Sequence, residues 1–354
     1  MNEVSELIAQ TAEKIMQNLS TKEVISESES GIWPKDLWRT LADAGMTKIG
    51  ISENLGGSGG SLQDAFSFLQ IAGKYSAPIP LVETLLANQM LSTVHLPLSD
   101  DPITFGYAND SESLNLKRDS NGWKLFGSLR YVPYARFSKY IVVVVKSEET
   151  NKIVLVDLNE CEIKTNQNLA GEARDQVLIK EVSIPESHVV QTWEFDESKI
   201  MLSGALLRAV QMTGALERIF ELTVSYSKQR VQFGRPIGQF QAIQQQIAIL
   251  AGELTAAKSI VNKAVKAFET GGGEKEIMMA KIRVGEAASK SARIAHQVHG
   301  AIGITEEYEL QQSTQRLWSW RDEFGNETYW AAKLGQEVIS MGAKRLWPFI
   351  TMRS

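Results

Sequence analysis

The sequence predicts an α+β protein with an N-terminal α-helical domain over residues 1–100, a small antiparallel β domain over 101–195 and a C-terminal antiparallel four-helix bundle over 196–354. Three observations predict this order. Apolar residues recur at helical spacing up to about residue 95, the period falls to two between about 102 and 190, and long apolar-rich helical segments follow. A chain of 354 residues is long enough for two or three domains.

The first hundred residues are predicted to be mostly helical. Apolar side chains at three- and four-residue steps predict helices over 3–18, 34–44, 62–74 and 80–95. Pro34 stands where a first helical turn tolerates proline, and Gly45 ends the second segment. The glycine loop at 56–60 (GGSGG) resembles a phosphate-binding loop, but no convincing strand precedes it and no lysine stands at nucleotide-motif spacing. We therefore expect a flexible loop between helices.

The middle of the chain is predicted to be a β domain. Strands are expected over 114–118, 123–129, 140–146, 153–158 and 177–184. The first two are joined by Asp119-Ser120-Asn121-Gly122, in which Asn-Gly supplies the positive φ of a tight turn. The run YIVVVVK at 140–146 is β-branched on both faces, as a buried strand is, and Pro185 ends the last strand.

The C-terminal part is predicted to be a bundle of long helices. These run over 197–230, 238–270, 274–299, 305–323 and 326–345, with breaks at glycine or proline between them. Helices of this length joined by short loops favour an antiparallel arrangement. His296 and His299 stand three apart on one of them without a third ligand at useful spacing, so we expect packing or hydrogen-bonding roles and no metal site.

Composition excludes several functions. Thirty-seven basic against 42 acidic side chains give a net charge of −5, which leaves no basic excess for nucleic acid. One cysteine, Cys161, excludes a disulfide scaffold or a multi-cysteine metal site. No run reaches the roughly 18 apolar residues of a membrane span, and the first residues lack a signal peptide's apolar core. We expect a cytoplasmic protein with no membrane span.

Three stretches together resemble the acyl-CoA dehydrogenase family. They are residues 33–86, which contain Trp38, GGSGGS and the run APIPLVETLL, residues 226–242 (YSKQRVQFGRPIGQFQA), and residues 296–307 (HQVHGAIGITEE). The second stretch is the most specific of the three. The likeness extends over nearly the whole chain, and the family's α–β–α domain order matches the order that periodicity predicts.

The resemblance implies an FAD-dependent oligomer that removes a proton from Cα and a hydride from Cβ of an acyl-CoA thioester. In the family, the flavin ring lies against one subunit's β domain, and the neighbour's bundle holds the pyrophosphate and adenine end. The candidate cofactor-binding residues here are Arg230, Phe233, Gln241, Gln297 and Gly300. Arg230 offers a permanently charged fork suited to a pyrophosphate, Phe233 covers the flavin edge, and Gly300 permits close approach of a ligand. Without the family motif, Arg230 and Gly234 read equally well as ordinary residues of a helix end.

The chain departs from the family where the flavin ring is held. The usual Thr-Glu-Pro-x-x-Gly-Ser-Asp loop corresponds to the shorter stretch from Thr104 to Ser111, which lacks that motif. The usual Trp-x-Thr/Ser, whose hydroxyl bonds flavin N5, corresponds to Tyr131-Val132-Pro133. Proline has neither a hydroxyl nor an N–H to offer.

The usual catalytic base is also missing. Most members carry a glutamate before a glycine between the last two helices, where this chain has Phe324-Gly325. Other members use a glutamate on the first bundle helix, where this chain has Gly204. Glu323 or Glu327 flanks the loop, and Glu323 is the better candidate for a displaced base. A one-residue shift turns a helical side chain by about 100°, and a base must reach its proton.

The chain retains the residues with which a family member binds the ADP end of its neighbour's FAD. It lacks the residues with which a member holds the flavin ring of its own FAD and removes the substrate proton. Heteromeric family members, including some that act on steroid side chains, divide in this way between a short and a base-bearing subunit. We therefore expect the short subunit of such an enzyme, with an acyl-CoA substrate and an acyl-CoA dehydrogenase partner. The alternatives are a self-sufficient homo-oligomer with a displaced base, a non-catalytic scaffold, and a flavin monooxygenase of the same fold.

Overall fold

The computed structural model describes residues 3–108, 114–120, 122–146, 150–342 and 344. Contacts divide the chain into two compact units, Met1–Phe68 with Ala77–Ile200 and Leu69–Ser76 with Met201–Ser354. The predicted limits of three domains at residues 100 and 195 stay a prediction. No helix in the described ranges combines the length and the apolarity that crossing a bilayer requires.

The first unit begins with five helices: α1 Glu3–Leu19, α2 Lys22–Glu29, α3 Lys35–Asp43, α4 Leu62–Lys74 and α5 Leu81–Thr93. Four of them confirm the predicted segments, and α2 was not predicted. Thr21 explains α2, because its side chain accepts a hydrogen bond from Val24 N and caps the helix. The last turn of α4 belongs to the second unit.

The glycine loop at 56–60 lies between helices, as predicted. Backbone hydrogen bonds pair it with the preceding segment, from Gly50 N to Gly59 O and from Gly59 N to Ile51 O, both at 2.9 Å. A Cβ on Gly57 would lie 2.2 Å from Ile51 O, so this glycine permits close backbone packing. These contacts give the glycines a role within the loop itself.

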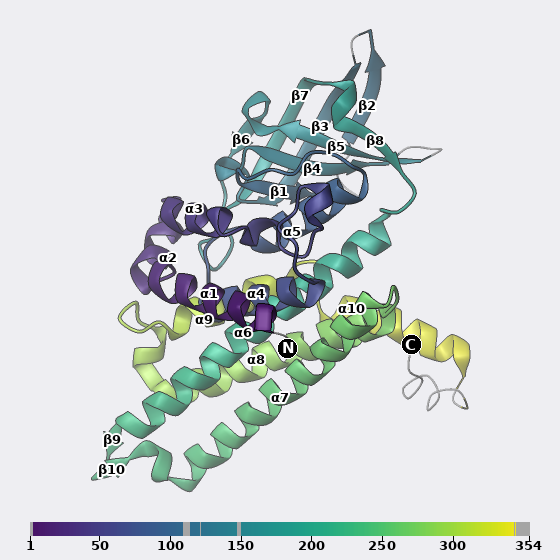
Figure 1. The fold of residues 1–354 in the computed structure, drawn as a ribbon. Helices are drawn as coiled ribbons and strands as arrows, with labels where there is room; N and C mark the ends of the chain where they lie inside the picture. Colours follow the sequence, from purple (N-terminus) through teal and green to yellow (C-terminus); the bar gives the residue numbers. More distant parts are fainter. Residues whose placement is uncertain (1–2, 109–113, 121, 147–149, 343, 345–354) are drawn as a thin grey trace. The chain divides into compact units, whose positions relative to one another are not determined.

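The β domain consists of two four-stranded sheets, shown in Figure 1. One has the order β1-β4-β5-β8 and the other β2-β3-β7-β6. The strands are β1 Ile103–Gly106, β2 Leu114–Asp119, β3 Gly122–Pro133, β4 Tyr140–Val145, β5 Asn151–Asp157, β6 Glu162–Lys164, β7 Arg174–Ile184 and β8 Val189–Thr192. Side chains of β3 and β7 form one apolar core with those of β4 and β5, so the sheets pack face to face.

One strand pair differs from the predicted antiparallel arrangement. β1 pairs with β4 in parallel, with Ile103 opposite Tyr140, whereas the other pairs within the two sheets are antiparallel. Four residues are too short for a period-two pattern, which is why the sequence did not reveal β1. The predicted β2–β3 hairpin is confirmed by its register, although Asn121 of its turn lies outside the described residues.

The second unit is a bundle of long helices, visible as the green and yellow rods of Figure 1. They are α6 Glu197–Gln229, α7 Gln241–Glu269, α8 Glu274–His299, α9 Leu310–Asp322 and α10 Glu327–Met341. These bounds confirm the predicted helices and their breaks. The last turn of α4 approaches α6 through a pair of glycines, because a Cβ on Gly73 would lie 2.0 Å from Gln211 O and one on Gly214 would lie 1.9 Å from Gln70 O.

Candidate functional site

A two-stranded hairpin follows α6 and holds two of the candidate residues. Val231–Gln232 (β9) pairs with Arg235–Pro236 (β10), which leaves Phe233 and Gly234 as the two turn residues. Their φ angles are 52° and 79°, and a two-residue hairpin turn with positive φ at both positions follows the type I′ pattern. Arg230 is tied to α6 by its N–H, which donates to Tyr226 O at 2.8 Å.

The Phe233 side chain is 92% exposed, more than any other large hydrophobic side chain of the described residues. A non-glycine residue at positive φ costs about 1 kcal/mol or more, and exposing an aromatic ring adds no stability in return. Its ring approaches that of Phe240 edge to face, with centroids 6.1 Å apart. Strained, exposed aromatic residues of this kind are typical of binding surfaces.

The start of α7 presents an uncapped helix N-terminus beside this hairpin. The helix begins at Gln241, and its N-cap residue Phe240 makes no side-chain capping bond. Both Gln241 and Arg230 are exposed. Free N–H groups and the positive end of the helix dipole favour an anion, and a nearby arginine strengthens that preference. Hairpin and helix start together can therefore bind a phosphate-bearing ligand.

The remaining two candidates lie where α8 ends. Gln297 is exposed on its last turn, and Gly300 is the C-cap residue with φ 65° and ψ −144°. Only glycine adopts this conformation readily, so the backbone itself requires Gly300. A Cβ there would meet no other atom within 4 Å. The predicted reason, close approach of a ligand, is therefore not needed to explain the glycine, although the space beside it is open.

An aromatic contact joins the two segments, and the sequence did not reveal it. The ring of Tyr226 on α6 stacks on that of His299 on α8, with centroids 4.5 Å apart and planes 25° apart. Arg230 follows Tyr226 by one helical turn, and His299 stands between Gln297 and Gly300. The stack thus links the end of α6, which residues 230–241 follow, to the end of α8, which holds residues 297–300. We call the five candidate residues in these segments the clamp.

The two positions at which the family carries its base lie against each other. Phe324 has a φ of 52°, and its ring covers Gly204 so closely that a Cβ on Gly204 would lie 2.2 Å from Phe324 Cδ1. The indole N–H of Trp330 donates to Phe324 O at 2.9 Å and fixes the loop. One aromatic ring therefore fills the space at both positions, and neither residue can accept a proton.

Glu323, the weak candidate for a displaced base, is engaged by an arginine. Arg208 Nη2 lies 2.5 Å from Glu323 Oε2, and the exposed fractions of the two side chains are 3% and 21%. The guanidinium carbon of Arg208 also lies 5.5 Å from the centroid of the Trp320 ring. This carboxylate would have to leave a nearly buried ion pair before it could reach a substrate proton.

A buried lysine lies beside the same loop. Lys281 Nζ donates to Arg321 O at 2.6 Å and to Trp320 O at 3.5 Å, so it caps the C-terminus of α9 from α8. Burial lowers its pKa to about 7, with Glu323 opposing and Arg208 reinforcing the shift. Sequence patterns could not single out this lysine, because α8 also carries Lys275 and Lys290.

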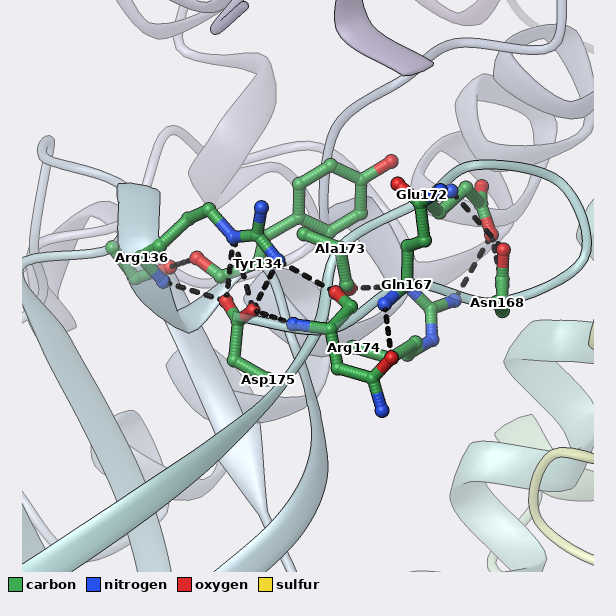
Figure 2. Close-up of polar contacts among 10 residues, drawn as sticks. Tyr134, Arg136, Gln167, Asn168, Glu172, Ala173, Arg174 and Asp175 are labelled. Atoms are coloured by element: carbon green, nitrogen blue, oxygen red, sulfur yellow. Dashed lines mark hydrogen bonds and ion pairs between the residues drawn. The ribbon is translucent and has the colours of Figure 1, made fainter. Parts of the chain in front are cut away.

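In the β domain, residues that follow the Tyr131–Pro133 segment form ion pairs with the start of β7 (Figure 2). Arg136 pairs with the fully buried Asp175 and also donates to Asn166 O at 2.6 Å. Pro133 ends β3, and its carbonyl accepts a hydrogen bond from Thr104 Oγ1 at 2.6 Å. The Arg136 guanidinium and the Thr104 hydroxyl therefore both bond within the protein and are not available to a ligand.

A second ion pair lies beside the first and was also not predicted. Arg174 and Glu172 pair at 3.0 Å, and both side chains are almost completely buried. Tyr131, in the place of the family's tryptophan, has a φ of 58° at a register shift of β3 and is 66% exposed. A β-bulge changes the direction in which a side chain points, which explains why Tyr131 is exposed.

The two histidines of α8 have the packing roles that the sequence predicted. His296 Nε2 lies 3.0 Å from Thr314 Oγ1, and His299 Nδ1 lies 2.8 Å from Ala295 O. Burial is the main cause that lowers the pKa of each ring. Among the described residues no cluster of three or more histidine, cysteine or acidic side chains could hold a metal.

Comparison with known proteins agrees with these features. Residues 2–95 match the model of the acyl-CoA dehydrogenase N-terminal domain, and residues 195–321 match that of the C-terminal domain. Acyl-CoA dehydrogenase IpdE2 of Mycolicibacterium smegmatis is 29% identical over 88% of this chain and 91% of its own length. IpdE2 of Mycobacterium tuberculosis is 29% identical over 78% of this chain and 79% of its own length.

Solved structures share the fold over almost the whole chain. A chain of the ChsE4-ChsE5 complex from Mycobacterium tuberculosis has a TM-score of 0.88 at 19% identity, covering 97% of this chain and 99% of that one. Butyryl-CoA dehydrogenase from Megasphaera elsdenii has a TM-score of 0.86 at 19% identity over 96% and 99% of the two chains. Both ends of the sequence and the complete fold thus identify the chain as a member of the acyl-CoA dehydrogenase family, whose cofactor is FAD.

Proposed function

We propose that this chain is one subunit of a hetero-oligomeric acyl-CoA dehydrogenase and lends its clamp to an FAD whose flavin ring lies on a partner subunit. The observation that carries the proposal is the contrast between two sites of the bundle. The clamp is exposed, whereas the two base positions are covered by the Phe324 ring. A subunit that only supports a neighbour's cofactor needs the first site and not the second.

The clamp fits the ADP half of FAD. Arg230 and the uncapped start of α7 offer positive charge and N–H groups to the pyrophosphate. Gln241 and Gln297 carry amides that can bond hydroxyl or phosphate oxygens, and the open space beside Gly300 leaves room for a ligand. The Phe233 ring is exposed to solvent, so it can cover a flavin that is bound to the partner subunit.

FAD held by the clamp residues would supply the acceptor for the hydride that leaves Cβ of the acyl-CoA thioester. The residues of this chain would bind and orient the cofactor's ADP end and exclude water from it. Proton removal from Cα would fall to a glutamate of the partner, because Phe324 and Gly204 carry no acid and Glu323 is held by Arg208. Related structures of two-component assemblies, ChsE4-ChsE5 and Tcur3481-Tcur3483, support this division of labour.

The test compares the lone chain with the chain co-expressed with a longer acyl-CoA dehydrogenase that carries the missing base. We expect the lone chain to be colourless and the complex to be yellow and bleached by an acyl-CoA. Stoichiometric FAD on the lone chain, reduced by an acyl-CoA, would contradict the proposal and favour a self-sufficient enzyme. A complex that forms but holds no flavin would favour the scaffold alternative.

A further inference from the structure

Three aromatic rings meet where the two segments of the clamp come together. His299 lies between Tyr226, with centroids 4.5 Å apart, and Tyr308, with centroids 5.1 Å apart. The two tyrosine rings approach each other edge to face at 6.0 Å. The three residues come from α6, from α8 and from the segment before α9. They therefore connect α6 with the end of α8 and with the segment that leads from α8 to α9.

His299 is held in the middle of this stack as a neutral ring. Its side chain is 4% exposed, and Nδ1 lies 2.8 Å from the carbonyl of Ala295, which makes Nδ1 the protonated nitrogen. Burial lowers the pKa of His299, which His296 reinforces and the backbone carbonyls of Ala295 and Leu222 oppose. A neutral ring stacks on tyrosine without leaving a buried charge to be compensated.

The stack is anchored at both sides. Tyr226 O accepts the N–H of Arg230 at 2.8 Å, so the tyrosine is tied directly to the first clamp segment. On the other side, Glu309 next to Tyr308 pairs with Arg218 of α6 at 2.8 Å. His299 itself stands between Gln297 and Gly300 of the second clamp segment. A displacement of the central ring would therefore change the separation of the two segments.

We infer that the Tyr226–His299–Tyr308 stack sets the spacing of the clamp, and that His299 is a positioning residue for the ADP part of the dinucleotide. This inference rests on the proposed function. The clamp residues themselves are exposed side chains, and exposed side chains do not fix their own separation. The buried rings do so, because a supporting layer of packed side chains is what holds a binding site to its required geometry.

The test measures the affinity for ADP of the co-purified complex after its flavin has been removed. His299→Ala deletes both ring contacts, and His299→Phe keeps a ring of similar shape. Each aromatic contact contributes about 0.5–1.5 kcal/mol, so we expect the alanine variant to bind ADP about tenfold more weakly. The phenylalanine variant should stay within about threefold of the wild type.

His296→Ala is the matched control. It removes a histidine from the same helix, one turn earlier, that stacks on Trp318 and contacts Thr314 rather than α6. We expect its ADP affinity to equal that of the wild type. Should His299→Ala not fold, Tyr308→Ala and Tyr308→Phe make the same comparison at the outer ring.

The possible outcomes separate the two claims. A lower melting temperature of His299→Ala with unchanged ADP affinity would overturn the positioning role and leave the clamp intact. Equal weakening by His296→Ala would also overturn it, because the effect would then be general loosening of α8. A wild-type complex that binds no ADP would instead contradict the proposed function itself.

Discussion

At the scale of single residues, Gly204 and Phe324 form a matched pair in which a large side chain fills the space that a missing one leaves. Spacing along the sequence located both positions but could not show that they touch. That contact depends on the positive φ of Phe324, which turns its ring toward α6. Sequence patterns report residue types and periods, whereas a single unusual dihedral angle is set by the whole loop.

The contact between Gly204 and Phe324 predicts that a methyl group added at position 204 changes stability in opposite directions with and without the Phe324 ring. Gly204→Ala should lower the free energy of unfolding by about 1–3 kcal/mol, because its Cβ would overlap the Phe324 ring. In a Phe324→Ala background, the same change should stabilise the protein by about 0.5–1 kcal/mol, as alanine does in a helix interior. Urea denaturation of the wild type, the two single variants and the double variant measures both changes in the free energy of unfolding. Gly252→Ala, on α7 with nothing within 4 Å of its Cβ, is the control. Equal effects in the two backgrounds would contradict the contact.

Replacing Glu323 should lower the stability of the fold and leave the rate of flavin reduction nearly unchanged. Glu323→Gln removes the charge that compensates nearly buried Arg208, and should destabilise the fold by about 1–3 kcal/mol. The rate of flavin reduction in the complex should stay within about twofold. Glu286→Gln, whose pair with Arg283 is 57% exposed at the carboxylate, is the surface control. Bound FAD that acyl-CoA no longer bleaches in the Glu323 variant would instead identify Glu323 as the base.

Lys281 predicts how stability depends on pH. Its pKa is about 7 in the folded chain against an ordinary value of 10.5, so between these values the unfolded chain binds a proton that the folded chain does not. Raising the pH through this window therefore favours the folded state, by about 1 kcal/mol per pH unit at most. The measurement is the free energy of unfolding of the wild type and of Lys281→Met at pH 7.5 and 9.5. Of these two proteins, only the wild type should be more stable at the higher pH.

The control for this pH dependence is Lys290→Met on the same helix, whose side chain is 46% exposed. It should retain the wild-type gain in stability between the two pH values. If Lys281→Met gained as much stability as the wild type, the buried lysine would be protonated in the fold and its assigned role as a neutral cap of α9 would be wrong.

At the scale of elements, the long helices were predictable, and the eight-residue helix α2 and the shortest strands were not. The long periodic segments α6, α7 and α8 have bounds close to those expected, because many repeats of one period define them. β1 and β6, with four and three residues, offer too little pattern. The β9–β10 hairpin was foreseen only as a Phe-Gly turn. Its aromatic residue at positive φ became visible as strain only in the structure.

The hairpin predicts a separation of stability from cofactor binding. Phe233→Ala should leave the unfolding free energy unchanged within about 0.5 kcal/mol, because the ring is 92% exposed. The same variant should release FAD from the complex faster, as followed by the rise in flavin fluorescence. Ile339→Ala, 81% exposed on α10 outside the clamp, is the matched control and should retain the flavin. Equal flavin retention in both variants would remove Phe233 from the clamp.

At the scale of the whole chain, the family fold and its FAD chemistry are established, and the division of labour is the part that remains proposed. The sequence located the clamp by its motif and the missing base by its absence. It could not show that Arg208 pairs with Glu323 or that Lys281 caps α9, since these contacts join residues 40 or more positions apart. The structure places Arg208 and Lys281 near Glu323, the better of the two acids considered as a displaced base.

The central claim is that this chain holds the ADP end of an FAD whose ring rests on another subunit. The most direct measurement is the ratio of FAD to protein in the purified complex when this chain alone carries Arg230→Ala and the partner is unchanged. We predict that the complex still assembles and loses most of its flavin, because the pyrophosphate loses its guanidinium partner. A full complement of FAD in that complex would contradict the claim.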